Sequence, residues 1–144
     1  MIAKAWIRGA GLVLAVYLAW FALLAMHVHT AWVSPMTTLM MLVTLNVPGL
    51  AALLTALRAP RYRFLLGLTM APVAAACAVA MNVVLAASGL RVDLSGFYDN
   101  LGLFFATTGY GLFVAVLGSA AGAKVGAGNA AEKLDATVTT LPKG

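Results

Sequence analysis

Four long apolar runs alternate with short polar segments along this chain of 144 residues. The runs cover about residues 9–26, 36–57, 64–90 and 101–123. A helix needs about 20 apolar residues to cross the roughly 30 Å of hydrocarbon in a bilayer, and each run is close to or above that length. The pattern predicts an all-α membrane protein in which residues 1–123 form one four-helix transmembrane bundle.

The composition of the chain favours insertion into a membrane. Hydrophobic residues make up 63% of the sequence, charged residues make up only 9%, and the mean hydropathy is +0.99. A soluble domain carries about a quarter charged residues. Because the four runs take up most of the chain, no room is left for a catalytic domain outside the bilayer.

The basic residues lie almost entirely at one end of the predicted spans. Arg58, Arg61 and Arg63 fill the connection between the second and third runs, and clusters of this kind collect in cytoplasmic connections. The other basic residues on that side are Lys4, Arg8, Lys124, Lys133 and Lys143, whereas Arg91 alone falls on the opposite side. This distribution predicts a multi-pass protein of the cell membrane, as in a bacterial inner membrane, with both termini cytoplasmic. We interpret the net charge of +5 as topology and contact with anionic lipid, not as nucleic-acid binding.

Beyond the fourth run the sequence becomes small and polar. Residues 124–144 include Gly126, Gly128, Asn129 and Glu132 but few large apolar side chains. Such a segment cannot bury a core of its own, so we expect a flexible cytoplasmic tail.

Two prolines fall at matching depth in adjacent runs. Pro48 lies ten residues before Arg58 and Pro72 lies nine residues after Arg63, which puts both near the middle of the bilayer. Proline removes one helical hydrogen bond, and interrupted helices often frame a transport site. Either the prolines frame a midplane cavity with Asn46 beside it, or the membrane helices simply tolerate them.

Two features of the third and fourth runs predict close helix contacts. Gly118, Gly122 and Gly126 recur every four residues on one helical face, where small residues let two backbones approach closely. This face can pack within the chain or on another subunit, and the sequence leaves both interpretations open. In the third run, Asn82 is expected to hydrogen-bond across helices, and a substrate contact is the alternative.

The predicted outer connections contain the remaining candidates for recognition. His27 and His29, with methionines nearby, suit copper or haem, although polar residues at a membrane interface are the simpler interpretation. The second outer connection and the residues after it hold Arg91, Asp93, Tyr98 and Asp99. These groups either recognise a ligand or form a solvated rim in which an acidic residue caps the fourth helix.

The sequence contains no hydrolase triad pattern, phosphate-binding loop or zinc-binding helix motif, and no acidic residue lies within a span. We therefore expect a non-enzymatic accessory or structural subunit of a larger membrane complex, with lipid and other membrane subunits or copies of itself as partners. Two alternatives remain. One is a small oligomeric transporter or flippase with a midplane cavity near Pro48 and Pro72, and the other is a copper or haem protein that uses His27 and His29.

Overall fold

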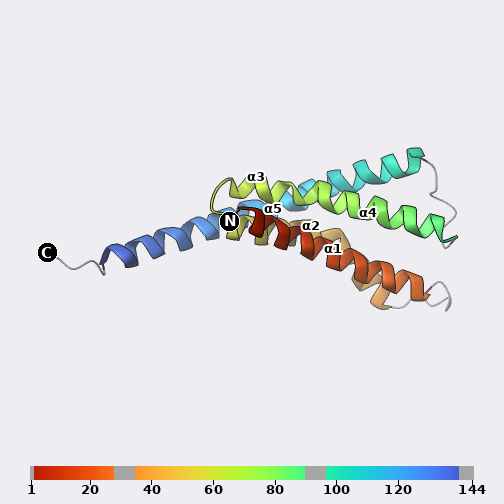
Figure 1. Ribbon diagram of the computed structural model, residues 1–144, viewed down its shortest axis with the longest axis horizontal. Helices are drawn as coiled ribbons and strands as arrows, with labels where there is room; N and C mark the ends of the chain where they lie inside the picture. Colours follow the sequence, from red (N-terminus) through yellow and green to blue (C-terminus); the bar gives the residue numbers. More distant parts are fainter. Residues whose placement is uncertain (1, 28–34, 90–96, 140–144) are drawn as a thin grey trace.

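The computed structural model describes residues 2–27, 35–89 and 97–139, and the regular structure in these ranges is helical (Figure 1). The helices are α1 (Ile2–His27), α2 (Pro35–Arg58), α3 (Arg63–Leu68), α4 (Met70–Ala87) and α5 (Phe97–Thr139). Within the described ranges, four segments are long and apolar enough to cross a membrane: Ile2–Ala25, Leu39–Arg58, Arg63–Ala87 and Asn100–Leu134. The predicted all-α fold, with four helical segments long and apolar enough to cross a membrane, is confirmed for the described residues. The side of the membrane on which the termini lie stays a prediction.

The last helix is the centre of the packing. α5 packs against α2, α3 and α4, whereas α1 packs against α2 and α4. The buried residues where these helices meet are mostly small: Ala51, Ala52, Ala71, Ala74, Ala78 and Ala115, with Val13, Tyr17, Val47 and Met70 as the larger side chains. Lipid tails are as apolar as these side chains, so close van der Waals packing between small residues must hold the helices together.

The glycine ladder of α5 packs against the backbone of α2. The ladder consists of Gly118, Gly122 and Gly126, and a methyl group added to each would collide with the carbonyl oxygen of Gly49, Leu53 and Leu57, respectively. Only a residue without a side chain permits the two backbones to lie this close. Of the two interpretations that the sequence left open, packing within the chain is the one observed.

The third span is divided into two helices at Thr69. Pro72 lies in the first turn of α4 and has no N–H to bond the carbonyl of Leu68, so the helical ladder is interrupted here. Thr69 Oγ1 accepts a hydrogen bond from Trp6 Nε1 of α1 at 2.9 Å. The run that we expected to form one helix is therefore two, and the break provides a polar anchor for α1.

The two midplane prolines have different surroundings. Pro48 is buried within α2, whereas Pro72 is exposed on the surface of the bundle. A methyl group added to Gly111 of α5 would lie 3.3 Å from Ala71 Cβ and 3.6 Å from Pro48 Cγ. One side of Pro48 is therefore packed close to Gly111 of α5 and to Ala71, whereas Pro72 lies on the surface of the bundle.

α5 continues well beyond the end of the fourth apolar run. Its 43 residues span roughly 65 Å, about twice the hydrocarbon thickness of a bilayer. In Figure 1 the blue C-terminal part of α5 projects past the other helices, at the end of the bundle where α1 begins. Residues 124–139 of the segment that we expected to form a flexible tail are therefore helical, and the flexibility of that segment stays a prediction. Alanine, glutamate and lysine favour helix, and extending an existing helix needs no new nucleation.

Candidate functional site: a basic hollow and an apolar groove

A hollow lined by basic side chains lies at the end of the bundle where α1 begins and α2 ends. Its volume is about 520 Å³, and its lining consists of Lys4, Ala5, Arg8, Leu57, Arg58, Arg63, Gly126, Asn129, Ala130 and Lys133. Five of these ten residues are cationic and none is acidic. We call this feature the basic hollow.

The cationic residues that line the basic hollow come from the start of α1, from the two sides of the α2–α3 turn and from α5. Lys4 and Arg8 lie one turn apart on α1, so their side chains leave the same face of the helix. Arg58 ends α2 and Arg63 begins α3. Between them Tyr62 adopts a left-handed backbone conformation with a φ of 52°, which lets the chain reverse within a few residues. The tight turn therefore brings Arg58 and Arg63 close enough together to line the same hollow.

The part of α5 beyond the apolar run completes the basic hollow. Gly126, Asn129, Ala130 and Lys133 line it and recur at the spacing of one helical face. A flexible segment would not keep these residues together. The continuation of α5 as a helix, which the composition did not lead us to expect, is what places Lys133 beside the other cations.

Arg63 is closely packed against α5. A methyl group added to Gly126 would lie 2.6 Å from Arg63 Nη1, so the glycine provides the room that the guanidinium occupies. The Nη1 atom is buried and has no hydrogen-bond partner among the described residues. A buried guanidinium N–H without an acceptor is unfavourable, because the group has lost its water and gained nothing in return. The basic hollow thus holds a donor that lacks an acceptor within the described protein.

The three arginines that the sequence marked for topology have different environments. Arg58 and Arg63 line the basic hollow, whereas Arg61 is exposed and does not contribute to the lining. Lys124 on α5 is likewise exposed and not part of the lining. At this end of the bundle some cationic side chains therefore line the hollow, and others are exposed outside it. The sequence does not distinguish the two groups.

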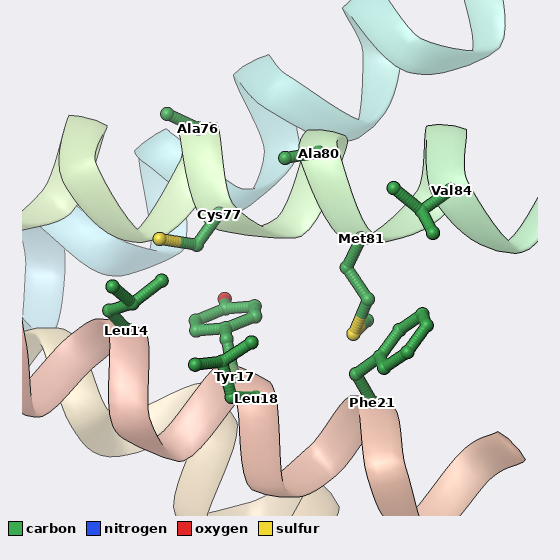
Figure 2. A pocket seen from close by; sticks show the side chains of 9 residues that line it. All are labelled: Leu14, Tyr17, Leu18, Phe21, Ala76, Cys77, Ala80, Met81 and Val84. Carbon is green, nitrogen blue, oxygen red and sulfur yellow. The ribbon is translucent and has the colours of Figure 1, made fainter.

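An apolar groove of about 410 Å³ lies between α1 and α4 (Figure 2). Its lining consists of Leu14, Tyr17, Leu18 and Phe21 of α1, and Ala76, Cys77, Ala80, Met81 and Val84 of α4. Figure 2 shows the rings of Tyr17 and Phe21 extending from α1 toward α4, and the side chains of Cys77 and Met81 extending back toward α1. Cys77 is a free thiol that lies among apolar groups, where it packs as a small hydrophobic side chain.

A smaller hollow of about 180 Å³ adjoins Pro48. Its lining consists of Tyr17, Thr44, Leu45, Pro48, Ala106, Thr107 and Tyr110, and Pro72 does not take part. Thr44 Oγ1 donates to the carbonyl oxygen of Met40 at 2.7 Å, within its own helix. This hollow has room for a few water molecules but not for a lipid.

The two asparagines at depth form hydrogen bonds within the protein. Asn82 Nδ2 of α4 donates to Asn100 Oδ1 of α5 at 2.8 Å, so Asn82 does hydrogen-bond across helices. Asn46 Nδ2 donates to the carbonyl oxygen of Leu42, one turn earlier in α2, at 2.8 Å. Asn46 therefore bonds within its own helix and not to a neighbouring one.

The residues considered for metal binding and for recognition at the outer face are only partly covered by the structure. His29, Arg91 and Asp93 lie outside the described residues. His27 is the last residue of α1, and Tyr98 and Asp99 lie in the first turn of α5. Among the described side chains, no group of three potential metal ligands occurs. A copper or haem site at His27 and His29 and a recognition site at the outer face stay predictions.

Comparison with family models, with curated proteins and with solved structures finds no match to this chain. The basic hollow and the apolar groove are therefore the two features from which a function can be inferred. They share α1 but differ in chemistry, since the lining of the hollow is rich in cationic side chains and the lining of the groove is apolar.

Proposed function

We propose that this chain is a non-enzymatic accessory or structural subunit of a larger membrane assembly, and that it docks there through the apolar groove between α1 and α4. The observation that carries this proposal is the groove itself, an open hollow of about 410 Å³ between two membrane-crossing helices. A concave apolar surface of this size fits the convex side of a transmembrane helix from a partner subunit.

Small residues on α4 favour a helix as the occupant of the groove. Ala76 and Ala80 lie one turn apart and are exposed. Because no atom beyond Cβ stands in the way, a second backbone can approach α4 closely, as it does where small residues recur every four positions. Leu14, Leu18 and Phe21 of α1 then provide side chains that contact the other flank of the incoming helix.

The test fills the groove with larger side chains and measures which membrane proteins co-purify with the chain. The double variant Ala76→Leu/Ala80→Leu is expected to lose membrane proteins that co-purify with the wild type in mild detergent, because the added side chains occupy the space of the partner helix. The matched control is Ala15→Leu/Ala19→Leu, a pair with the same spacing that is exposed on α1 outside the groove lining. The control is expected to retain those partners.

Two results would count against a role as a docked subunit. One is a wild-type protein that purifies alone and stays monomeric at its native expression level. The other is equal loss of partners in both double variants, since that would locate the effect in general lipid contact and not in the groove.

The transporter alternative has less support from the geometry. It rests on a midplane cavity near Pro48 and Pro72, and the hollow that adjoins Pro48 measures only about 180 Å³ and lacks Pro72. The copper or haem alternative rests on His27 and His29. Elemental analysis and a visible absorption spectrum of the purified protein test it, and an empty result removes it.

A further inference from the structure

We propose that the basic hollow is a binding site for a phosphate-bearing anion. Its lining brings five cationic side chains together from α1, the α2–α3 turn and α5, with no acidic residue among the ten that form it. Several cations gathered in a recess with apolar walls produce a positive potential, which attracts anions. This site does not depend on the groove or on the proposed role as a subunit.

The positions of the side chains favour a built site over a general excess of charge. Arg63 Nη1 is buried and has no hydrogen-bond partner among the described residues, and Gly126 leaves the room that the guanidinium needs. A guanidinium presents a planar fork of N–H donors that matches the oxygens of a phosphate group. Because Arg63 also lines the hollow, an anion there would meet a guanidinium whose hydrogen-bonding capacity the described residues leave partly unused.

The number of cations indicates the class of anion. A carboxylate carries one negative charge, which is small beside the five cationic side chains of the lining. A phosphomonoester or a diphosphate carries more charge and more acceptor oxygens, so it can contact several of these side chains at once. Lys4, Arg8 and Lys133 line the same hollow as Arg63, so such a group can contact side chains from α1, α3 and α5 there.

Two sources can supply this chemistry. Arg58 and Arg63 mark the ends of the second and third membrane-crossing segments, so the hollow lies at the level where lipid headgroups begin. A headgroup can enter from the membrane, and a soluble anion can enter from the water. The chemistry of the site is the same in both cases, and the experiment distinguishes them.

The experiment uses the full-length protein in two arms. In one arm, inorganic pyrophosphate is titrated into protein held in nanodiscs of phosphatidylcholine, and binding is followed by calorimetry. In the other, nanodiscs also contain phosphatidic acid, and native mass spectrometry measures how strongly this lipid is retained by the released protein. Binding in the first arm identifies a soluble anion, and retention confined to the second identifies a lipid headgroup.

The matched variants are Arg63→Gln and Arg61→Gln. Both remove one positive charge from the same turn, but only Arg63 lines the hollow. Arg63→Gln is expected to weaken binding by about tenfold or more, as is usual for the loss of a hydrogen bond to a charged group. Arg61→Gln is expected to change binding by less than about twofold, as is usual for an exposed charge.

A second pair keeps the test valid if Arg63→Gln does not fold. Lys133→Gln, in the hollow, is compared with Lys124→Gln, which is exposed on the same helix outside it. Stronger loss of binding in Lys133→Gln supports the site. The proposal is overturned if both members of a folded pair weaken binding equally, or if the wild type binds neither pyrophosphate nor phosphatidic acid.

Discussion

Gly109 and Gly118 belong to the same helix but have opposite surroundings. Gly109 is exposed, and a methyl group added there would meet no atom within 4 Å. A methyl group on Gly118 would instead collide with the carbonyl oxygen of Gly49 on α2. Close approach of the two backbones, and not the glycine content of α5 as such, therefore determines which glycine the fold requires.

Gly118→Ala is expected to destabilise the bundle by about 1–3 kcal/mol, because α2 and α5 must separate to admit the methyl group. Gly109→Ala is expected to be neutral or slightly stabilising, since the methyl group finds open space and alanine favours helix. Unfolding of both variants in mixed micelles by a graded denaturing detergent checks the difference. Equal effects of the two substitutions would show that the contact with Gly49 is not a constraint.

At the residue scale the sequence predicts the small face of α5 but not its partner. A repeat of small residues every four positions indicates that some backbone comes close. It does not say which one, because Gly49 in α2 carries no distinguishing signal until the helices are placed side by side. The same holds for Asn82. The sequence indicates that an amide in an apolar span needs a hydrogen-bond partner, but Asn100 becomes that partner only because of where α5 begins.

At the element scale, the hydrogen bond between Asn82 and Asn100 joins α4 to α5 at the end opposite the basic hollow. A double-mutant cycle with Asn82→Ala and Asn100→Ala is expected to give a coupling free energy of about 0.6 kcal/mol, the usual value for polar pairs between membrane helices. Denaturation of the four proteins in the same micelles supplies the measurement. A coupling indistinguishable from zero would mean that the two amides stabilise the bundle independently.

The continuation of α5 past the apolar run leads to a second prediction at this scale. Ala127 lies exposed in the helix interior, and Ala127→Pro removes a helical hydrogen bond at a cost of about 3 kcal/mol. The variant is expected to lose helical content in circular dichroism and to bind pyrophosphate or phosphatidic acid more weakly, because Asn129 and Lys133 leave the hollow. Ala127→Ser is the matched control and should retain both properties. Unchanged helical content in Ala127→Pro would contradict a helix that continues to Thr139.

The helices themselves differ in how far the sequence predicts them. Four apolar runs indicate four spans, because hydrocarbon excludes unpaired backbone polar groups and so requires helices. The division of the third span at Thr69 follows from Pro72, but the same reasoning applied to Pro48 would have divided α2, which continues through it. The continuation of α5 is harder to predict, because low hydropathy favours a solvated tail whereas alanine, glutamate and lysine favour a helix.

At the scale of the whole molecule, the orientation in the membrane is the clearest prediction to test. In a Cys77→Ala background, Arg61→Cys and Ser88→Cys place single thiols at opposite ends of the bundle, and both positions are exposed. A membrane-impermeant maleimide applied to intact cells is expected to label only Ser88→Cys, because the basic end should face the cytoplasm. Labelling of Arg61→Cys instead would reverse the orientation.

The basic hollow is a property of the whole molecule and not of any one segment. The sequence shows Lys4, Arg8, Arg58, Arg63 and Lys133 on the same predicted side of the membrane, and their simplest interpretation is topology. Their convergence requires the packing of α5 against α2 and the continuation of α5 as a helix. One signal was present, since Gly126, Asn129, Ala130 and Lys133 share the spacing of a helical face.

The lining of the basic hollow includes Lys4 of α1 and Lys133 of α5, so it draws on the first and the last of the described helices. During synthesis the hollow cannot form until α5 has left the ribosome and has joined the other helices. An anion held there binds only the finished bundle, and by mass action it stabilises that state over every partly assembled one. Stability would then vary with the supply of the anion, so a membrane poor in it would contain more incompletely assembled protein.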